Sequence, residues 1–198
     1  MEPSFDSVSR QQFRRFFQPS RLVVCVLPDT SDARWNLITV SFNMYCSYKP
    51  PMMAIAIQNI NRSYELAQNA EQFVLAVPGE RLAEDTMRFG WESSRDQDKV
   101  AASGVALISS ETVAVPGLRD AIANIELVKR SVVTSGDHVI LTGEVLKFGV
   151  NKSNLEQNLL SVGPDTGGYR VLSKRGIHRI AVIGDPPARS ASEDDEEA

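Results

Sequence analysis

Residues 123–150 read ANIELVKRSVVTSGDHVILTGEVLKFGV, and they carry the strongest structural signal in the chain. Two long runs rich in aliphatic and β-branched residues, Ala123–Thr134 and His138–Val150, flank Ser135-Gly136-Asp137. β-Branched residues favour strands, and a short connection that contains Gly and Asp is typical of a β-hairpin. The segment therefore predicts a long hairpin.

Other runs of strand-forming residues lie on both sides of this hairpin: Leu22–Leu27, Trp35–Tyr45, Met52–Ile57, Phe73–Val77 and Tyr169–Leu172. The first two flank the turn-forming segment 28–32 and are expected to pair as a second hairpin. Met52–Ile57 is almost uninterrupted in its apolar character, which favours a strand buried on both faces.

Short helices are expected at four further places: Ser9–Gln18, Asn61–Ala70, Gly79–Phe89 and Asp96–Ala102. Ser9 and Asn61 have side chains that cap helix starts, whereas Pro19 and Gly104 are residues that end helices. Many strands with a few short helices predict a β-barrel with helical insertions, an α+β fold.

The composition indicates one domain with a single core. Of the 198 residues, 42% are hydrophobic and 23% are charged, as in globular proteins. We find no fixed-period repeat and no run of ~18 apolar residues, so neither a solenoid nor a membrane-spanning protein is expected. The N-terminus lacks a basic segment followed by an apolar one, and the expected location is the cytoplasm.

The acidic charge lies at the C-terminus. Five acidic residues at 193–197 account for the net charge of −4, since without them basic residues outnumber acidic ones by one. We expect residues 186–198 to be a disordered tail and residues 1–185 to form the domain. A nearly neutral body without a basic stripe argues against nucleic acid or a membrane surface as partner.

Several kinds of site are not indicated by the motifs. Cys25 and Cys46 form no C-x-x-C pair, and His138 and His178 stand in no metal-binding motif, so no metal is expected. The patterns G-x-G-x-x-G, G-x-x-x-x-G-K-[ST] and G-x-S-x-G are also absent. A Rossmann site, a P-loop and a hydrolase elbow are therefore not expected.

Two polar segments lie where strands are predicted to end. Small hydroxyls interrupt the apolar segment 36–47, and such a mixture suits a flat aromatic ligand, although hydroxyls also occur on solvent-facing strands. Arg62 and Ser63 open a predicted helix directly after a strand. That placement suits an anion, and it equally suits an ordinary capped helix with a solvated arginine.

Two more polar segments have simple alternative explanations. Residues 88–99 form a helix end that passes into a charged loop, and such charge runs are usually solvated. His138 follows Gly136-Asp137 at the start of a strand, where a polar hairpin residue is common.

Taken together and in this order, the segments resemble the flavin reductase-like family, whose fold is the FMN-binding split barrel of Greek-key type. The resemblance covers about Phe13 to Leu172 and rests on these stretches: Asn36–Ser41, Pro50–Ile57, Asn59–Ser63, the R-D-x-D-K motif at Arg95–Lys99, and the G-D-H-x-x-x-x-G-E-V motif at Gly136–Val145. The last two are the more specific ones.

The resemblance implies a homodimer that holds one FMN or FAD per subunit near the dimer interface. NADH or NADPH would reduce the flavin by hydride transfer, and the protein would be the small reductase component that supplies reduced flavin to a partner monooxygenase. The alternatives are an FMN-binding electron carrier without efficient NAD(P)H reaction and a cofactor-free interaction module on the same scaffold.

The resemblance also assigns residues. His138 would border the nicotinamide as the catalytic position, and the cofactor-binding residues would be Asn36, Thr39, Val40, Ser41, Cys46, Ser47, Asn59, Arg62, Ser63, Phe89, Arg95 and Lys99. Three features depart from the family pattern: the bulky segment Asn43–Cys46, Val100 in place of an aromatic residue, and Gly176–Asp185, which has no counterpart.

Overall fold

The structure, a computed structural model, describes residues 16–161 together with Ser7, Ser9 and Phe13, and the backbone of 171–175 and 180–184. The chain divides into one unit of residues 20–161 and another of 1–19 with 162–198. The expected acidic tail at 186–198 and the segment 176–179 lie outside the described residues, and the expected domain extent of 1–185 stays a prediction. Within the expected N-terminal helix Ser9–Gln18, Phe13 N donates to Ser9 O at 2.9 Å.

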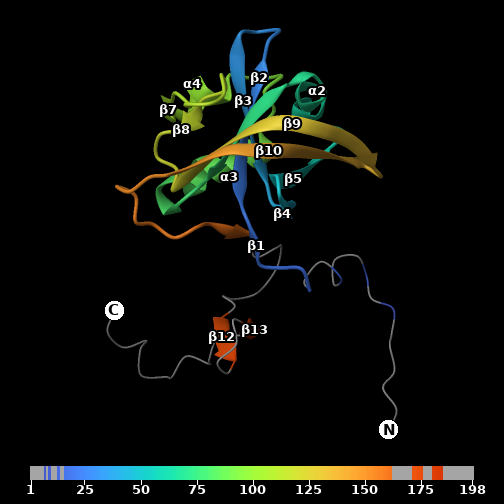
Figure 1. The fold of residues 1–198 in the computed structure, drawn as a ribbon, viewed down its shortest axis with the longest axis vertical. Coiled ribbons are helices and arrows are strands. Elements are labelled where there is room, and N and C mark those ends of the chain that lie inside the picture. The colour runs from blue at the N-terminus through green and yellow to red at the C-terminus, as the bar shows by residue number, and fades with distance from the viewer. Residues whose placement is uncertain are drawn as a thin grey trace, which may run out of the picture. The chain divides into compact units, whose positions relative to one another are not determined.

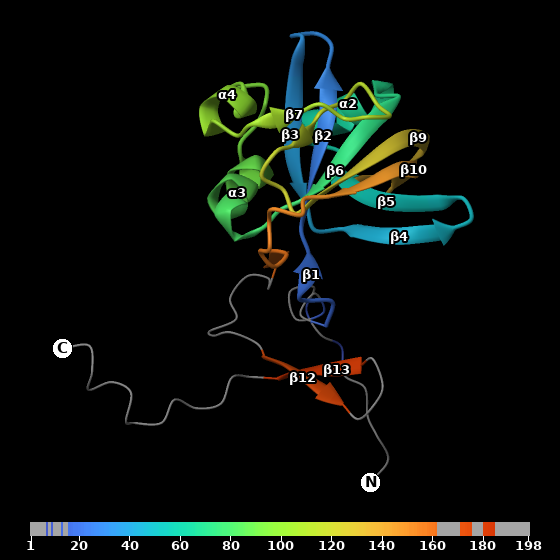
Figure 2. The same cartoon turned by 60° about the vertical axis from the view of Figure 1, so that its left-hand side comes forward.

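A seven-stranded antiparallel sheet forms the larger unit (Figures 1 and 2). Its spatial order is β3-β2-β6-β9-β10-β5-β4. The strands are β2 (Val23–Asp29), β3 (Arg34–Val40), β4 (Asn43–Tyr48), β5 (Pro51–Gln58), β6 (Gln72–Val77), β9 (Ala123–Ser135) and β10 (His138–Val150). The expectation of a mostly β protein with a few helices is confirmed.

The helices lie against this sheet. They are α2 (Arg62–Asn69), the 3₁₀ turn η1 (Glu80–Leu82), α3 (Ala83–Trp91) and α4 (Lys99–Ser103). In Figure 2, α3 and α4 lie beside β3, and α2 lies beside β2. α3 and α4 therefore cover the β3 edge of the sheet, and α2 lies against its neighbour β2.

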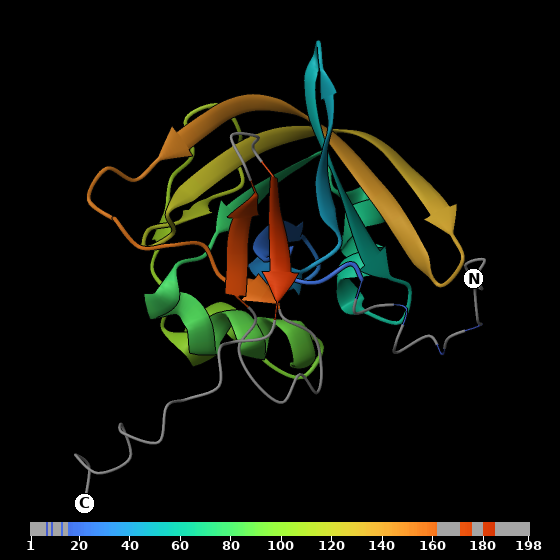
Figure 3. The ribbon, with the colours of Figure 1, turned by 90° about the horizontal axis from the view of Figure 1, so that it is seen from below.

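The described residues also form three short antiparallel strand pairs outside the seven-stranded sheet. β1 (Ser20–Arg21) pairs with β11 (Leu160–Ser161), and β7 (Leu107–Ile108) pairs with β8 (Gly117–Leu118). In the other unit, β12 (Val171–Arg175) and β13 (Ile180–Gly184) form an antiparallel hairpin, coloured orange-red in Figure 3. The strand expected at Tyr169–Leu172 corresponds in part to β12.

The predicted long hairpin is confirmed. β9 and β10 pair from His138 opposite Ser135 to Val150 opposite Ala123. Gly136 in the turn has a φ of 61°, a left-handed conformation that glycine adopts without strain. Gly143 lies beneath the Phe73 ring, because a Cβ there would be 2.6 Å from Phe73 Cζ. The strand thus needs a glycine at this position to pack against β6.

The expectation of one strand over Trp35–Tyr45 is wrong. The chain leaves β3 after Val40 and enters β4 at Asn43, so Ser41 and Phe42 form a corner between them. β3 and β4 are the two edge strands of the sheet, and no hydrogen-bonded pairing joins them within residues 16–161. The run of β-favouring residues continues through the corner, and composition alone therefore does not mark it.

Two helix predictions need shifted boundaries. The segment expected as one helix from Gly79 to Phe89 begins as the 3₁₀ turn η1 and continues as α3 to Trp91. The helix expected at Asp96 begins at Lys99, because the Asp98 carboxylate accepts hydrogen bonds from the backbone N–H groups of Val100 and Ala101. That capping places the start of α4 three residues later than expected.

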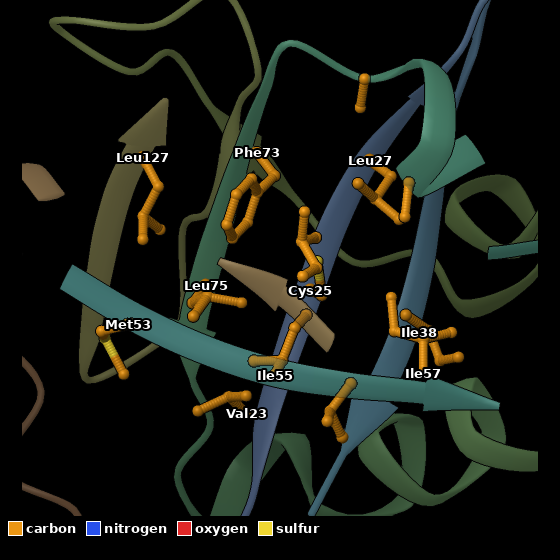
Figure 4. Close-up of a cluster of buried hydrophobic side chains, with 14 of the residues drawn as sticks. Val23, Cys25, Leu27, Ile38, Met53, Ile55, Ile57, Phe73, Leu75 and Leu127 are labelled. Atoms are coloured by element: carbon orange, nitrogen blue, oxygen red, sulfur yellow. The ribbon is translucent and has the colours of Figure 1, made fainter. Parts of the chain in front are cut away.

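The core has two hydrophobic clusters that use alternate residues of the same strands. Val23, Cys25 and Leu27 of β2 belong to the cluster shown in Figure 4, whereas Val24 and Val26 belong to the other. Alternation of this kind means that β2 is buried on both faces. Burial raises the pKa of the Cys25 thiol, so this cysteine is a core residue rather than a reactive one.

Candidate functional site

A cavity of about 150 Å³ lies where β3, the start of α2 and the end of α3 meet. It brings together six of the predicted cofactor-binding residues: Asn36, Arg62, Ser63, Phe89, Arg95 and Lys99. These positions are up to 63 residues apart in the chain, and only the fold places them around one space. The cavity is therefore the candidate site.

Two buried polar atoms on the cavity wall have no hydrogen-bond partner. Asn36 is 1% exposed; its Nδ2 donates to Ser63 Oγ at 2.8 Å, and its Oδ1 is without a partner. Ser94 is 6% exposed, and its Oγ is likewise unpartnered. Buried polar groups are normally paired, so both atoms point to a ligand that completes them. Because Ser63 Oγ accepts from Asn36, its own hydroxyl hydrogen is left for another acceptor.

Arg62, predicted to hold a phosphate, is engaged by carboxylates in the structure. Its guanidinium bonds to Glu65 and lies 3.1 Å from Asp29 Oδ1 and 2.9 Å from Ser31 Oγ. Burial acts to raise the pKa of Asp29, but hydrogen bonds from Ser31 and Arg62 outweigh it and hold that pKa below its usual value. The Arg62 charge is thus offset on one side of the cavity.

Arg95 reaches the same acidic residue from the loop after α3. Its Nη2 donates to Glu65 Oε1 at 2.6 Å, and its Nη1 donates to the carbonyl oxygen of Ile60 at 3.3 Å. The hydrogen bonds from Arg62 and then Arg95 hold the pKa of Glu65 below its usual value.

Asn61 precedes α2 as predicted, but its side chain makes no capping bond there.

Lys99 is buried, with only 4% of its surface exposed. Its ammonium donates to Leu37 O at 2.7 Å and to Phe89 O at 3.0 Å. An ammonium has three N–H groups, so one remains for a group in the cavity. Burial lowers the pKa of Lys99 to about 8, against a smaller opposing effect of the Glu92 charge.

The hydroxyl-rich segment around the β3–β4 corner does not line this cavity. Thr39 donates its hydroxyl to the carbonyl oxygen of Thr86 in α3. Val40 is in the core, and Ser41 is half-buried at the corner. Cys46 is exposed at an irregular position of β4, and Ser47 beside it is half-buried. Thr39 stays close to the cavity, since a Cβ on the lining residue Gly90 would be 3.7 Å from Thr39 Cβ.

His138 and Asn59 are neighbours in a second polar group. Asn59 N donates to Asp137 O at 2.9 Å, and His138 is paired opposite Gln58 across β5 and β10. His138 Nδ1 is 2.6 Å from Asp137 Oδ1, and the ring centroid is 5.6 Å from that of Phe42. The histidine therefore faces the corner that Phe42 forms, rather than the cavity.

Three residues that line the cavity or pair with its arginines were not selected from the sequence. Ser94 lies in a serine- and charge-rich loop where nothing distinguishes it from its neighbours. Asp29 and Glu65 were missed because ion pairing over 33 and 30 residues depends on the fold. The only local signal was the spacing of Arg62 and Glu65, which places them one helical turn apart.

A larger cavity of about 470 Å³ lies near the other end of β10. The asparagine side chains that line it are hydrogen-bonded to backbone groups: Asn124 to Leu118, Asn151 to Arg119 and Ala121, and Asn154 to Asp120. It contains none of the predicted site residues. Volume is therefore a poorer guide here than the unpartnered atoms of the smaller cavity.

Among the described residues, no three His, Cys, Asp or Glu side chains converge as metal ligands. No helix in that part of the chain combines the length and apolar character needed to cross a bilayer.

The chain is similar to several known proteins. It is 29% identical over 111 residues to an uncharacterized protein of Archaeoglobus fulgidus, a match that covers 56% of this chain and 63% of that one. The FMN-binding protein of Thermus thermophilus, solved with p-hydroxybenzaldehyde, has a TM-score of 0.70 at 22% identity over 82% of this chain and 92% of that one. The NADH:FAD oxidoreductase of Streptomyces globisporus has a TM-score of 0.68 at 20% identity over 81% and 96%.

The structural likenesses show a shared fold, and the sequence match identifies the family. The family described as "Flavin reductase like domain" matches residues 13–172. This range includes the whole sheet, the cavity and His138, in agreement with the expectation from the sequence. The chain therefore belongs to the flavin reductase like domain family.

Proposed function

We propose that the protein is an NAD(P)H-dependent flavin reductase that acts on FMN or FAD. The observation that carries the proposal is the cavity with unpartnered Asn36 Oδ1 and Ser94 Oγ at the start of α2, in a chain of this family. The similarity to an NADH:FAD oxidoreductase supports the reaction, and the similarity to an FMN-binding protein supports the cofactor class.

The cavity fits one end of a flavin nucleotide rather than the whole molecule. Complete small-molecule sites typically measure ~300–1,000 Å³, whereas this one measures about 150 Å³. Its hydroxyls, the helix start and two arginines suit a phosphate, and Asn36 Oδ1 suits a hydroxyl donor such as the ribityl chain offers. The isoalloxazine would then lie toward Thr39, Ser41 and the corner.

The residues of this chain hold and orient the reactants. Ser63, Ser94 and the arginines bind the phosphate end, while Lys99 fixes the end of α3 against β3. His138, beside Phe42, positions the nicotinamide, and no protein acid or base is needed. A bound flavin supplies the two-electron acceptor for the nicotinamide. The protein aligns the two rings and excludes water around them.

We further propose a homodimer built as a split barrel of Greek-key type. An exposed aromatic group supports the dimer: Tyr45 lies 5.5 Å from Tyr48 and 6.4 Å from Phe148 between ring centroids. These rings are 44–86% exposed, an amount of apolar surface that a second subunit would cover. The cytoplasmic location and a monooxygenase that receives the reduced flavin belong to the same proposal.

An FMN-binding electron carrier is the second candidate. The similarity to a protein described only as FMN-binding favours it. A carrier would bind flavin in the same cavity but would not turn over nicotinamide.

The test combines flavin binding with nicotinamide oxidation in the purified protein. We expect FMN or FAD to bind, and NADH or NADPH to be consumed steadily when free flavin is added. Flavin binding without turnover would favour the carrier, and no flavin binding would favour a cofactor-free module. Ser94→Ala should weaken binding, whereas Ser109→Ala, at an exposed serine of the larger cavity, should leave it unchanged.

A further inference from the structure

One carboxylate, Glu65, holds both arginines of the cavity. Glu65 Oε2 accepts from Arg62 Nη1, and Glu65 Oε1 accepts from Arg95 Nη2 at 2.6 Å. The two arginines come from different elements, since Arg62 starts α2 and Arg95 lies on the loop between α3 and α4. Both line the cavity, but Glu65 does not.

Both arginines are therefore ion-paired without a ligand. Arg62 is paired with Asp29 as well as Glu65, so two guanidinium groups face two carboxylates. Arginine binds phosphate and carboxylate with the same planar donor geometry. An incoming phosphate and Glu65 thus compete for the same donors.

Helix stabilisation does not account for the whole arrangement. An acidic residue in the first turn stabilises a helix through its dipole, and Glu65 occupies such a position. That effect needs no contact with Arg95, which is 30 residues away in the chain and also donates to Ile60 O. Glu65 additionally fastens the loop that carries Ser94 and Arg95 to the start of α2.

We propose that Glu65 sets the affinity for the phosphate end of the ligand by competing for Arg62 and Arg95. With the cavity empty, the two arginines bond to Glu65; with a phosphate bound, they transfer to it. The competition weakens binding, so that flavin exchanges as a substrate instead of staying as a tightly held cofactor. This inference rests on the proposed function.

Replacing the carboxylate with an amide of the same shape removes the competing charge. In Glu65→Gln, we expect FMN to bind about tenfold more tightly, a change of ~1.4 kcal/mol. Riboflavin has no phosphate, and its affinity should not change. Inorganic phosphate should compete with FMN more effectively in the variant, and FMN should dissociate more slowly.

A matched control replaces another acidic residue that also forms an ion pair. Glu71 is 85% exposed and pairs with Lys129 at 3.4 Å, away from the cavity lining. Glu71→Gln should leave the affinities for FMN and riboflavin unchanged. Glu65→Asp keeps the charge and should stay closer to the parent than to Glu65→Gln.

The parent protein offers a measurement that needs no variant. The side-chain Nε–H signals of Arg62 and Arg95 should shift in NMR spectra when FMN or inorganic phosphate is added, and riboflavin should leave them in place.

The outcomes separate this inference from the proposed function. If the parent binds FMN but Glu65→Gln binds it equally well or more weakly, or if the arginine signals do not respond to phosphate, the role of Glu65 is wrong and the proposed function stands. If the parent binds no flavin, the proposed function fails first.

Discussion

The ammonium of Lys99 lies 2.7 Å from the carbonyl oxygen of Leu37, at the open edge of the sheet. Leu37 is in β3, whose other side pairs with β2, so this carbonyl has no neighbouring strand to bond to. The same ammonium holds the carbonyl of Phe89 near the end of α3. One buried lysine thus closes a strand edge, fixes a helix end and forms part of the cavity wall.

Replacing Lys99 with methionine should destabilise the protein by ~1–3 kcal/mol at pH 7, because leaving two carbonyl groups without a donor costs more than the variant gains by no longer burying the ammonium charge. Chemical denaturation would measure the loss. A variant with the parent's stability would show that water replaces the ammonium without penalty.

The stability of the parent should rise with pH between about 8 and 10.5 relative to Lys99→Met. The folded protein holds Lys99 with a pKa of about 8, below its ordinary value of 10.5, so the unfolded chain binds more protons in this window. Below about pH 8 the lysine is charged in both states, and the cost of burying that charge is fully present. The neutral amine still has two N–H groups for the two carbonyls.

Denaturation curves of both proteins at pH 7, 8, 9 and 10 would show this difference, of up to ~3 kcal/mol. A constant gap between parent and variant would contradict the lowered pKa.

The long hairpin was predictable because its signals are local. Strand-forming residues on both sides of Gly136 and Asp137 determine β9 and β10 without reference to the rest of the chain. The β3–β4 corner was not predictable, because Ser41 and Phe42 differ little in strand preference from their neighbours. What separates the two strands is that each pairs with a different partner, at opposite edges of the sheet.

The candidate site, like the fold, was only partly predictable from the sequence. The resemblance selected Arg62 and Ser63, and the structure places both at the cavity. Sequence alone gave no sign that Asp29 and Glu65 offset the Arg62 charge, since ion pairs depend on side chains that only the fold brings together.

Arg62→Ala should weaken FMN binding about tenfold and leave riboflavin binding nearly unchanged, because a charge-assisted hydrogen bond to a phosphate contributes ~1.5–3 kcal/mol and Glu65 offsets part of it. Fluorescence titrations with both flavins would measure this. Equal losses for the two ligands would contradict a phosphate role. The melting temperature should also fall, since the Asp29 side chain, 2% exposed, loses its cation.

The aromatic surface of β4 and β10 should be necessary for dimerisation. Sedimentation of the parent should give twice the chain mass, and the double variant Tyr45→Ser, Phe148→Ser should sediment as a folded monomer, because both rings are exposed in the single chain. A parent that is monomeric while binding flavin tightly would remove the interface from the proposal. A variant that remains dimeric would place the interface elsewhere.

His138→Ala should lower the rate of NAD(P)H oxidation and leave flavin affinity and stability almost unchanged. The ring is 5.6 Å from Phe42 and is bonded to Asp137, outside the cavity that would hold the flavin phosphate. A positioning role predicts a lower kcat/KM for the nicotinamide with normal flavin binding, because the hydride donor is held less well and no proton transfer is lost. Stopped-flow reduction of bound flavin by NADH and by NADPH would measure the effect, with a thermal melt to confirm folding. Reduction at the parent rate, or a loss of activity that only follows unfolding, would leave His138 as a polar residue that opens a hairpin strand.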